Sequence, residues 1–384
     1  MKPDSRVKCI GVVGLAALPR EISSTFNRFV EDLAKQATVS SIGLFGSWSR
    51  YDASPASDYD VLVVDRREFD YELHERVEYD GLLMDISRIP RKWVAEVISP
   101  VVDHMLHETI ILYDPSGMLK RARDWVEGNY RTPGRVEVRT EQYLSSADTY
   151  LSRATAAMTR GDLETASLFS DMSLTPIAHI IMDIAGIPIT RGAFVWNLRR
   201  ACQKIDMIGI YKVILSNTRL GGLEKADVSS YLDRFESVWR RISQYMADNR
   251  EVVEGLHEML RDEINYLTDP TVLKGVFVRV EEMLDENNFI EAANYMRGWL
   301  LPLLQDYAWL ISAKQGAKFD YTALFKTISL YEGPAGIYDG ATEIFNLRNL
   351  ERNAVRQEIE SARSIIAYIR KKRREMIDGL VGRG

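Results

Sequence analysis

Two aspartates at the start of an apolar strand are the residues of this chain best suited to do chemistry. Asp58 and Asp60 lead into the run Val61–Val64, and alternate residues of a strand point to the same face. The two carboxylates should therefore lie side by side at the start of a buried strand, where like charges are costly unless they are paired or coordinate a cation. Hard oxygen ligands favour Mg²⁺ or Mn²⁺. The pattern predicts a divalent-cation site.

A third carboxylate comes from the next pair of strand patterns. Asp80-Gly81 is a strong hairpin signal between short strands at 75–79 and 82–88, because both central turn positions need positive φ. On the second strand, Asp85 interrupts an apolar run. If this strand neighbours the strand that begins at Asp60, three carboxylates share one face. Such a set is the outline of a two-metal site, with metals ~3.5–4 Å apart, for phosphoryl transfer.

Phosphate-binding chemistry precedes the aspartates. Gly46-Ser47 ends an apolar strand pattern, and a glycine followed by a hydroxyl residue lets backbone N–H groups approach phosphate oxygens closely. Arg50 could add a guanidinium to the same phosphates. These residues predict a nucleoside triphosphate with its β- and γ-phosphates on Gly46-Ser47 and its α-phosphate beside the carboxylates.

The order Gly46-Ser47, a short spacer, then Asp58-Tyr59-Asp60 and an apolar strand resembles the DNA-polymerase-β-like nucleotidyltransferase superfamily. The branch that it resembles most contains minimal and antibiotic nucleotidyltransferases, and Asp85 falls where the third carboxylate of the superfamily stands. The resemblance covers roughly residues 20–115. Two residues depart from the usual pattern: Trp48 replaces a basic residue and Tyr59 replaces an aliphatic one.

The resemblance implies a reaction. Asp58, Asp60 and Asp85 would hold Mg²⁺ (or Mn²⁺) and act as the catalytic residues, while Gly46-Ser47 and Arg50 would bind the donor NTP, which we expect to be ATP. A nucleoside monophosphate would pass to an acceptor hydroxyl and pyrophosphate would leave. Related antibiotic enzymes use a helical bundle to help form the acceptor pocket, which favours a small hydroxylated acceptor.

Composition is that of an ordinary globular protein, with 46% hydrophobic and 27% charged residues among 384. The two cysteines, Cys9 and Cys202, are too few for a disulfide framework. The apolar stretch Val7–Leu18 is too short to span a bilayer, and we expect no membrane helix and a cytoplasmic location. A net charge of −6 argues against broad nucleic-acid affinity, so nucleic acid is an unfavoured partner.

The pattern of elements predicts an α+β chain: a small mixed β-sheet domain followed by a large all-α helical-bundle region. We predict a nucleotidyltransferase catalytic domain over 1–130, a helical bundle that binds the acceptor over 131–225, and a second bundle of unassigned role over 226–384. Expected strands cover 39–45, 60–65, 75–79, 82–88 and 109–113, with helices at 20–37 and 90–106 and another ending near 128. Helices should then cover 136–160, 162–185, 192–204, 206–215, 226–247, 250–265, 271–285, 288–313, 319–329 and 340–378.

The helical region shows signs of internal duplication. Helical patterns that open at Gly161-Asp162 and at Asn288-Phe289 each reach a proline, Pro176 or Pro302, which should kink or break the helix. Each then leads through a glycine to an aromatic-rich segment. Helical bundles share such features without duplication, so the repeat stays a hypothesis. The last long helix should pack internally, although its apolar stripe would also suit a homodimer seam.

Several alternatives remain open. The acceptor could instead be a protein or an RNA, as in toxin–antitoxin relatives, or the chain could be a non-catalytic nucleotide-binding scaffold. Glu108 could be a general base, but an ordinary strand-edge carboxylate is the favoured interpretation. The basic cluster Arg370–Arg374 favours stabilisation of a helix end over contact with nucleic acid. Arg250 and His257, on one expected helix, have the spacing of some helical RNases, which chance explains more easily.

Overall fold

The computed structural model describes residues 20–331 and 336–381. The stretch Val7–Leu18 and Cys9 lie outside the described residues. By internal contacts the chain divides into two compact units, Met1–Tyr130 and Arg131–Gly384. We call them the N-terminal unit and the helical unit and describe each by itself.

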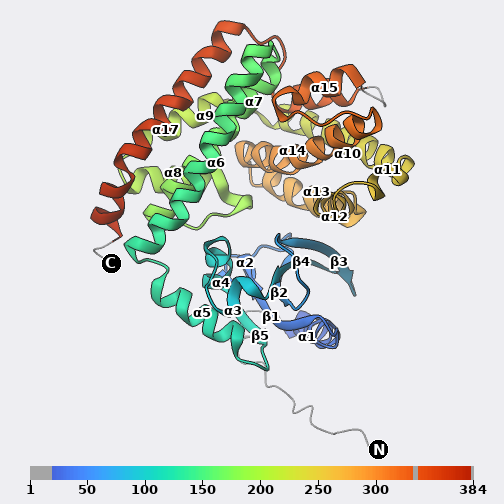
Figure 1. Ribbon diagram of the computed structural model, residues 1–384, viewed down its shortest axis with the longest axis vertical. Helices are drawn as coiled ribbons and strands as arrows, with labels where there is room; N and C mark the ends of the chain where they lie inside the picture. The colour runs from blue at the N-terminus through green and yellow to red at the C-terminus, as the bar shows by residue number, and fades with distance from the viewer. Residues whose placement is uncertain (1–19, 332–335, 382–384) are drawn as a thin grey trace, which may run out of the picture. The chain divides into compact units, whose positions relative to one another are not determined.

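A five-stranded mixed sheet forms the N-terminal unit, with strand order β3-β4-β2-β1-β5 (Figure 1). Strands β2 and β4 are parallel, whereas the other neighbouring strands are antiparallel. The predicted α+β class with a mixed sheet is confirmed. The elements are α1 (Arg20–Ala34), β1 (Val39–Phe45), α2 (Gly46–Arg50), β2 (Tyr59–Asp65), β3 (Leu73–Tyr79), β4 (Leu82–Pro90), α3 (Lys92–Ala95), η2 (Pro100–Val102), α4 (Asp103–Glu108), β5 (Ile110–Tyr113) and α5 (Met118–Asn129).

Each face of the sheet has its own apolar core because side chains alternate along β2. Val61 and Val63 pack with α1 on one face, whereas Leu62 and Val64 pack with α3, α4 and α5 on the other. Asp60 has the same parity as Leu62. Its carboxylate therefore lies on the face covered by α3–α5, at the end of the strand beyond that core.

The prediction of one long helix in this unit is wrong. The segment expected to be a single helix over 90–106 is instead α3, a turn, η2 and α4. Pro100 begins η2, and Ser99 before it is extended, with φ −64° and ψ 132°. A proline disfavours helical backbone at the residue that precedes it, and here that residue is extended, so the expected helix is interrupted before Pro100.

The helical unit contains α-helices and two short 3₁₀ turns in the part that the structure describes. Its elements are α6 (Pro133–Arg160), α7 (Leu163–Ala185), η3 (Arg191–Ala193), α8 (Phe194–Lys204), α9 (Ile208–Asn217), α10 (Lys225–Asp248), α11 (Arg250–Glu254), α12 (Glu258–Leu267), α13 (Pro270–Asp285), α14 (Phe289–Lys314), η4 (Tyr321–Ala323), α15 (Leu324–Tyr331), α16 (Ile337–Ile344) and α17 (Arg352–Leu380).

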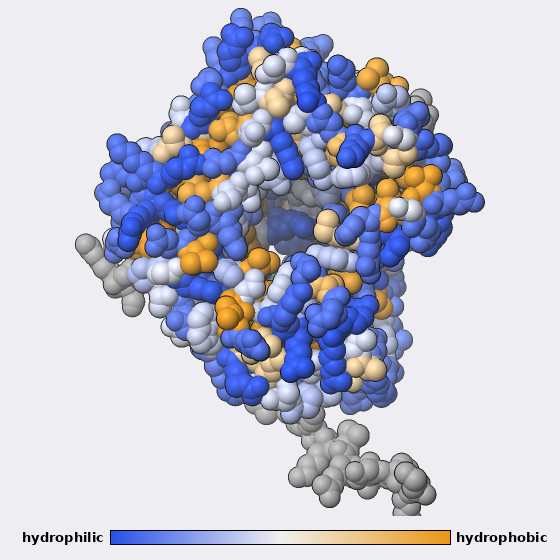
Figure 2. Space-filling model, viewed as in Figure 1, coloured by the Kyte–Doolittle hydropathy of each residue, from blue (hydrophilic) through white to orange (hydrophobic). Residues whose placement is uncertain are grey.

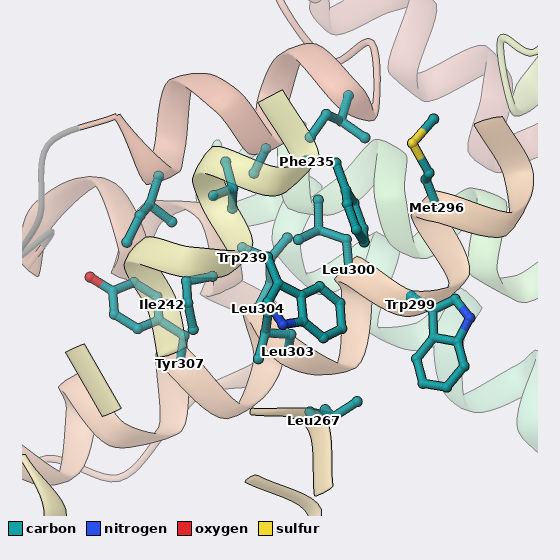
Figure 3. Close-up of a cluster of buried hydrophobic side chains, with 14 of the residues drawn as sticks. Phe235, Trp239, Ile242, Leu267, Met296, Trp299, Leu300, Leu303, Leu304 and Tyr307 are labelled. Carbon is teal, nitrogen blue, oxygen red and sulfur yellow. The ribbon is translucent and has the colours of Figure 1, made fainter. Parts of the chain in front are cut away.

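Two large apolar clusters hold the helical unit together. One lies around α10 and α14, where Trp239, Leu304 and Tyr307 are almost completely buried (Figure 3). The other joins α6, α7 and α8 to α17. In Figure 1, α17 lies alongside α6 and α7. Residues 226–384 therefore do not form a separate bundle, because their last helix packs on the helices that follow the N-terminal unit.

The helical unit repeats one order of elements. We call the part that contains α6 to α8 its first half and the part that contains α13 to α15 its second half. Helices α6 and α7 are followed by η3 and α8, as α13 and α14 are followed by η4 and α15. Neither Pro176 nor Pro302 ends its helix, because the apolar packing of each long helix as a whole offsets the hydrogen bond lost at the proline. The short helix of each half begins against the long helix of the other: Glu291 accepts the N–H groups of Val195 and Trp196 at 3.0 and 3.2 Å.

The second half returns the same contact. The N–H of Phe325 donates to Thr165 Oγ1 at 2.8 Å, and the N–H of Lys326 donates to Asp162 Oδ2 at 3.0 Å. Both acceptors lie at the start of α7, as Glu291 lies at the start of α14. These reciprocal contacts support the duplication hypothesis, because two unrelated helical segments would not be expected to make matching contacts.

Two other predicted helices are interrupted. The segment 250–265 breaks at Gly255, so Arg250 lies in α11, where it pairs with Glu254, and His257 caps the N-terminus of α12. The two residues do not share a helix, and the RNase-like hypothesis loses its basis. The segment 340–378 breaks between α16 and α17, where Asn346 and Asn349 have positive φ.

Helix α7 is long and apolar enough to cross a membrane by length and composition, which the sequence analysis does not predict. However, 78% of its most apolar window is buried inside the structure, as is usual for the core helix of a folded unit. The face shown in Figure 2 is mostly hydrophilic, with apolar residues in small separate groups.

The basic cluster near the C-terminus joins α17 to α6. Arg370 contacts both carboxylate oxygens of Asp148. Arg373 donates to Thr140 Oγ1 at 3.0 Å and pairs with Glu141. These contacts favour the stabilising role over a surface for nucleic acid.

Candidate active site

Two of the three predicted carboxylates lie on neighbouring parallel strands, and the third directly precedes one of these strands. Asp60 on β2 is directly opposite Asp85 on β4, and Asp58 lies two residues before Asp60. We call these three residues the carboxylate row. The side chain of Asp58 is 29% exposed and that of Asp85 18%. Burial, together with the charges of Asp58 and Asp85, raises the pKa of Asp60 well above its usual range. The row therefore crowds three acidic groups together at one end of the sheet, where ionisation of Asp60 is disfavoured.

The hairpin that carries Asp85 forms as predicted. Asp80 and Gly81 both have positive φ, 47° and 83°, and β3 pairs with β4 in antiparallel register. The turn therefore sets which residue of β3 faces Asp85.

Gly46 touches the row directly. It follows β1 with φ +73°, and a Cβ atom at this position would lie 1.9 Å from Asp60 Oδ2. Only glycine has both the backbone freedom and the lack of a side chain that this contact requires. Ser47 follows in the short turn α2. The predicted phosphate-binding residues are thus next to the predicted metal ligands.

Arg50 forms an ion pair with Glu108. Its Nη1 lies 2.5 Å from Glu108 Oε2, and its Nε lies 3.2 Å from Asp52 Oδ2. Burial by itself would lower the pKa of Arg50, but the charge of Glu108 and the contacts with Asp52 raise it overall. Burial also raises the pKa of Glu108, while Arg50 and the N–H of Gly46 partly oppose that rise. Glu108, assigned above to an ordinary strand edge, is part of the site.

Arg76 is the site residue that the sequence analysis missed. It comes from β3, and its Nη1 lies 2.5 Å from Asp58 Oδ2 and 3.1 Å from Asp85 Oδ2. Its side chain is only 3% exposed. The signal was present in the predicted hairpin, because pairing outwards from Asp80-Gly81 places Arg76 opposite Asp85.

The two departures from the superfamily pattern pack on each other. The rings of Trp48 and Tyr59 are stacked, with centroids 4.9 Å apart and planes at 7°. Tyr59 also contacts Phe26 of α1, on the face opposite the carboxylate row, and burial raises its pKa to about 12. The two residues thus form one packing unit beneath the turn at Gly46-Ser47.

The donor set of the row suits a hard cation in its chemistry. It offers three carboxylates, and Gly46 leaves their inner side open to close approach. As the side chains stand, however, no group of three His, Cys, Asp or Glu residues within the described ranges is arranged to hold a metal ion. The Arg76 guanidinium lies between Asp58 and Asp85 instead. The donor set therefore matches Mg²⁺ or Mn²⁺ in its chemistry, while the space between Asp58 and Asp85 is taken by that guanidinium.

A nucleotidyltransferase-domain family model matches residues 24–110. This range contains every residue of the site described above, so the N-terminal unit contains a nucleotidyltransferase domain. The helical unit lies outside the matched range. No curated protein matches the chain.

Among solved structures, a nucleotidyltransferase-like protein from Exiguobacterium sibiricum 255-15 is similar over 91% of each chain, with 10% identity and a TM-score of 0.31. A likeness at this score carries no argument about the fold or function of the helical unit.

Proposed function

We propose that this protein is a metal-dependent nucleotidyltransferase that moves a nucleoside monophosphate from an NTP, ATP in our proposal, to an acceptor hydroxyl. The observation that carries the proposal is the carboxylate row, with Asp60 opposite Asp85 on parallel strands and Gly46 against Asp60, inside a domain that the nucleotidyltransferase model matches. The three acids and the proposed phosphate-binding residues Gly46-Ser47 are adjacent and lie within the matched range, which supports the proposal.

The proposed reaction is an in-line displacement. The acceptor oxygen forms a bond to the α-phosphorus, the bond from that phosphorus to the oxygen bridging to the β-phosphate breaks, and pyrophosphate leaves. Asp58, Asp60 and Asp85 would hold Mg²⁺ or Mn²⁺, which supplies charge neutralisation at the α-phosphate when bound. Gly46 and Ser47 would position the β- and γ-phosphates, with Arg50 beside them.

A base must take the proton from the attacking hydroxyl of the acceptor substrate. Asp85 is the proposed base, as the third carboxylate of the row. Glu108 is not proposed as this base, because it pairs with Arg50 and lies beside Gly46, on the side of the β- and γ-phosphates that leave as pyrophosphate. Positioning and charge neutralisation would supply most of the rate enhancement.

We propose a small hydroxylated molecule as the acceptor and a role for the helical unit in recognising it. The net charge of −6 and the pairing of the basic cluster with α6 support this choice over an RNA. A protein side chain is the alternative acceptor. The full carboxylate row opposes the scaffold alternative, because nothing in binding alone requires three crowded acids. Low cysteine content supports a cytoplasmic location.

The test is pyrophosphate release with each of the four NTPs and Mg²⁺ or Mn²⁺, against pooled aminoglycosides, a metabolite extract, tRNA and cell protein. Asp60→Asn is the inactive variant, and Asp80→Asn is its matched control. Asp80 lies in the turn of the hairpin that carries Asp85, is exposed and has a positive φ that asparagine adopts readily. We expect release that depends on one acceptor pool, is lost in Asp60→Asn and persists in Asp80→Asn. Equal release from both variants would refute the site.

A further inference from the structure

Arg76 occupies the place that a cation between Asp58 and Asp85 would need. One guanidinium nitrogen, Nη1, lies within hydrogen-bond distance of an oxygen of each carboxylate. Charge-assisted contacts of this kind use the lone pairs with which a carboxylate would bind a metal ion. The guanidinium also carries a positive charge between the two carboxylates, so it and a divalent cation compete for these oxygens.

The backbone cannot move Arg76 away without breaking the sheet. Arg76 is paired with Asp85 in the β3–β4 register, and the turn at Asp80-Gly81 fixes that register. Only rotation of its side chain can vacate the space. A guanidinium that leaves two carboxylates needs another anion, because burying it unpaired is costly. The phosphates of an NTP are the anions that the proposed reaction brings to this place.

We propose that Arg76 is an internal counter-ion that competes with the divalent cation and couples its binding to the arrival of the NTP. This inference rests on the proposed function. In the absence of nucleotide, the guanidinium holds Asp58 and Asp85 and the cation binds weakly. When the NTP arrives, the guanidinium turns from the carboxylates to the phosphates, and the cation takes the vacated oxygens. Arg76 is thus a positioning residue whose effect is on the order and strength of binding.

The simpler interpretation is that Arg76 only stabilises the fold. A purely structural arginine would lower stability when replaced but would leave the affinity for a metal ion unchanged or weaker. If Arg76 competes with the cation, its replacement should instead strengthen the affinity for a metal ion. Arg88 provides a control: it is a buried arginine on the adjacent strand β4, paired with Asp65 and Glu75.

The experiment measures Mn²⁺ binding to the full chain from the electron paramagnetic resonance signal of free Mn²⁺, with and without α,β-methylene-ATP. We expect Arg76→Gln to tighten Mn²⁺ binding without nucleotide by about tenfold or more, because the ion no longer has to displace charge-assisted hydrogen bonds from Asp58 and Asp85. The same variant should lose most of the nucleotide-dependent increase in affinity. Arg88→Gln should keep the wild-type affinity and coupling. Melting temperatures of all variants report folding separately.

A second variant keeps the proposal testable if Arg76→Gln does not fold. A lysine offers one compact charge in place of the fork that bridges two carboxylates, so Arg76→Lys should bind Mn²⁺ more tightly than the wild type but less tightly than Arg76→Gln. Binding by folded Arg76 variants that equals or falls below the wild type would overturn the proposal. If no protein binds Mn²⁺ in a way that Asp60→Asn removes, the metal site of the proposed function fails as well. If transfer occurs but affinity does not change, only the role of Arg76 fails.

Discussion

The carboxylate row and two buried acids of the helical unit, Asp183 and Glu291, are all largely removed from water, but their charges are compensated in different ways. In the helical unit, buried Asp183 receives two hydrogen bonds from Arg139, at 2.9 and 2.8 Å, and buried Glu291 receives backbone N–H groups. In the N-terminal unit, Asp58, Asp60 and Asp85 crowd together, and one arginine contacts two of them. Complete pairing favours a structural role. Where one arginine serves two of three crowded acids, the negative charge is only partly compensated, and such a place is a candidate for a functional site.

The largest effect that this comparison predicts is in Asp60→Asn. Pyrophosphate release should fall by about three orders of magnitude, as for loss of a central catalytic carboxylate. Folding should not suffer. The pKa of Asp60 is raised in the folded chain, so at pH 7 the unfolded state ionises this group more readily and folding is disfavoured. Replacing the acid should leave the melting temperature equal or higher, and a clear drop would mean that Asp60 is structural.

Arg139→Met tests the opposite case. The Arg139 side chain is 2% exposed and donates to both oxygens of Asp183, so the variant removes both hydrogen bonds and leaves this buried charge only Arg131, 3.9 Å away. We expect a loss of about 3–5 kcal/mol in the free energy of unfolding. The control is Arg370→Met on α17, because its ion pair with Asp148 is exposed and should contribute no more than about 1 kcal/mol. Equal losses in urea titrations of the two variants would contradict the comparison.

Gly46→Ala sharpens the comparison at the edge of the carboxylate row. Left-handed backbone costs a residue with a side chain about 1–2 kcal/mol, and the new Cβ would also displace the Asp60 carboxylate. The control is Gly81→Ala, because Gly81 also has positive φ but no atom within 4 Å of the added Cβ. Both variants should lose stability in thermal melts. Only Gly46→Ala should also lose pyrophosphate release.

The smallest effect concerns Asp306, an acid of the helical unit that breaks the rule of complete pairing. It is buried, its Oδ2 has no hydrogen-bond partner, and burial together with the charge of Glu263 raises its pKa well above the usual range. A raised folded pKa costs stability as pH rises above the ordinary carboxyl value of about 3.9. Asp306→Asn should therefore be more stable than the wild type at pH 7, and the gain should shrink toward pH 4.

The exposed Asp233 on α10 supplies the control for that experiment. Chemical unfolding of Asp233→Asn at pH 4 and pH 7 should give nearly the same difference from the wild type. A pH-independent gain in Asp306→Asn would show that its folded pKa is ordinary.

Local signals were enough to predict the sheet and the carboxylate row. Apolar runs bounded by turn residues gave the strands, and Asp80-Gly81 gave the hairpin with the positive φ values that the structure shows. Asp85 could be placed beside Asp60 because both interrupt apolar strand patterns. The hairpin register also places Arg76 opposite Asp85, but nothing local in the sequence indicates that the arginine side chain contacts the carboxylates.

Contacts between distant segments could not be predicted in the same way. Nothing local indicates that α17 packs on α6 and α7, or that the ring of Trp48 covers Tyr59. The division of the expected helix at 90–106 did carry a local signal in Pro100, whose effect on the residue before it was not applied. Residues 39–113 were therefore easier to derive than the helical unit, whose order depends on long-range packing.

The reciprocal caps between the two halves of the helical unit also determine how this unit assembles. Glu291 closes the start of α8, while Thr165 and Asp162 receive the start of α15, so each half completes the other. Because both halves lie on one chain, each meets its partner at an effective concentration set by the intervening residues and not by the amount of protein in solution. The helical unit should therefore unfold at a temperature that does not change on dilution, and neither half should keep its short helix when produced alone.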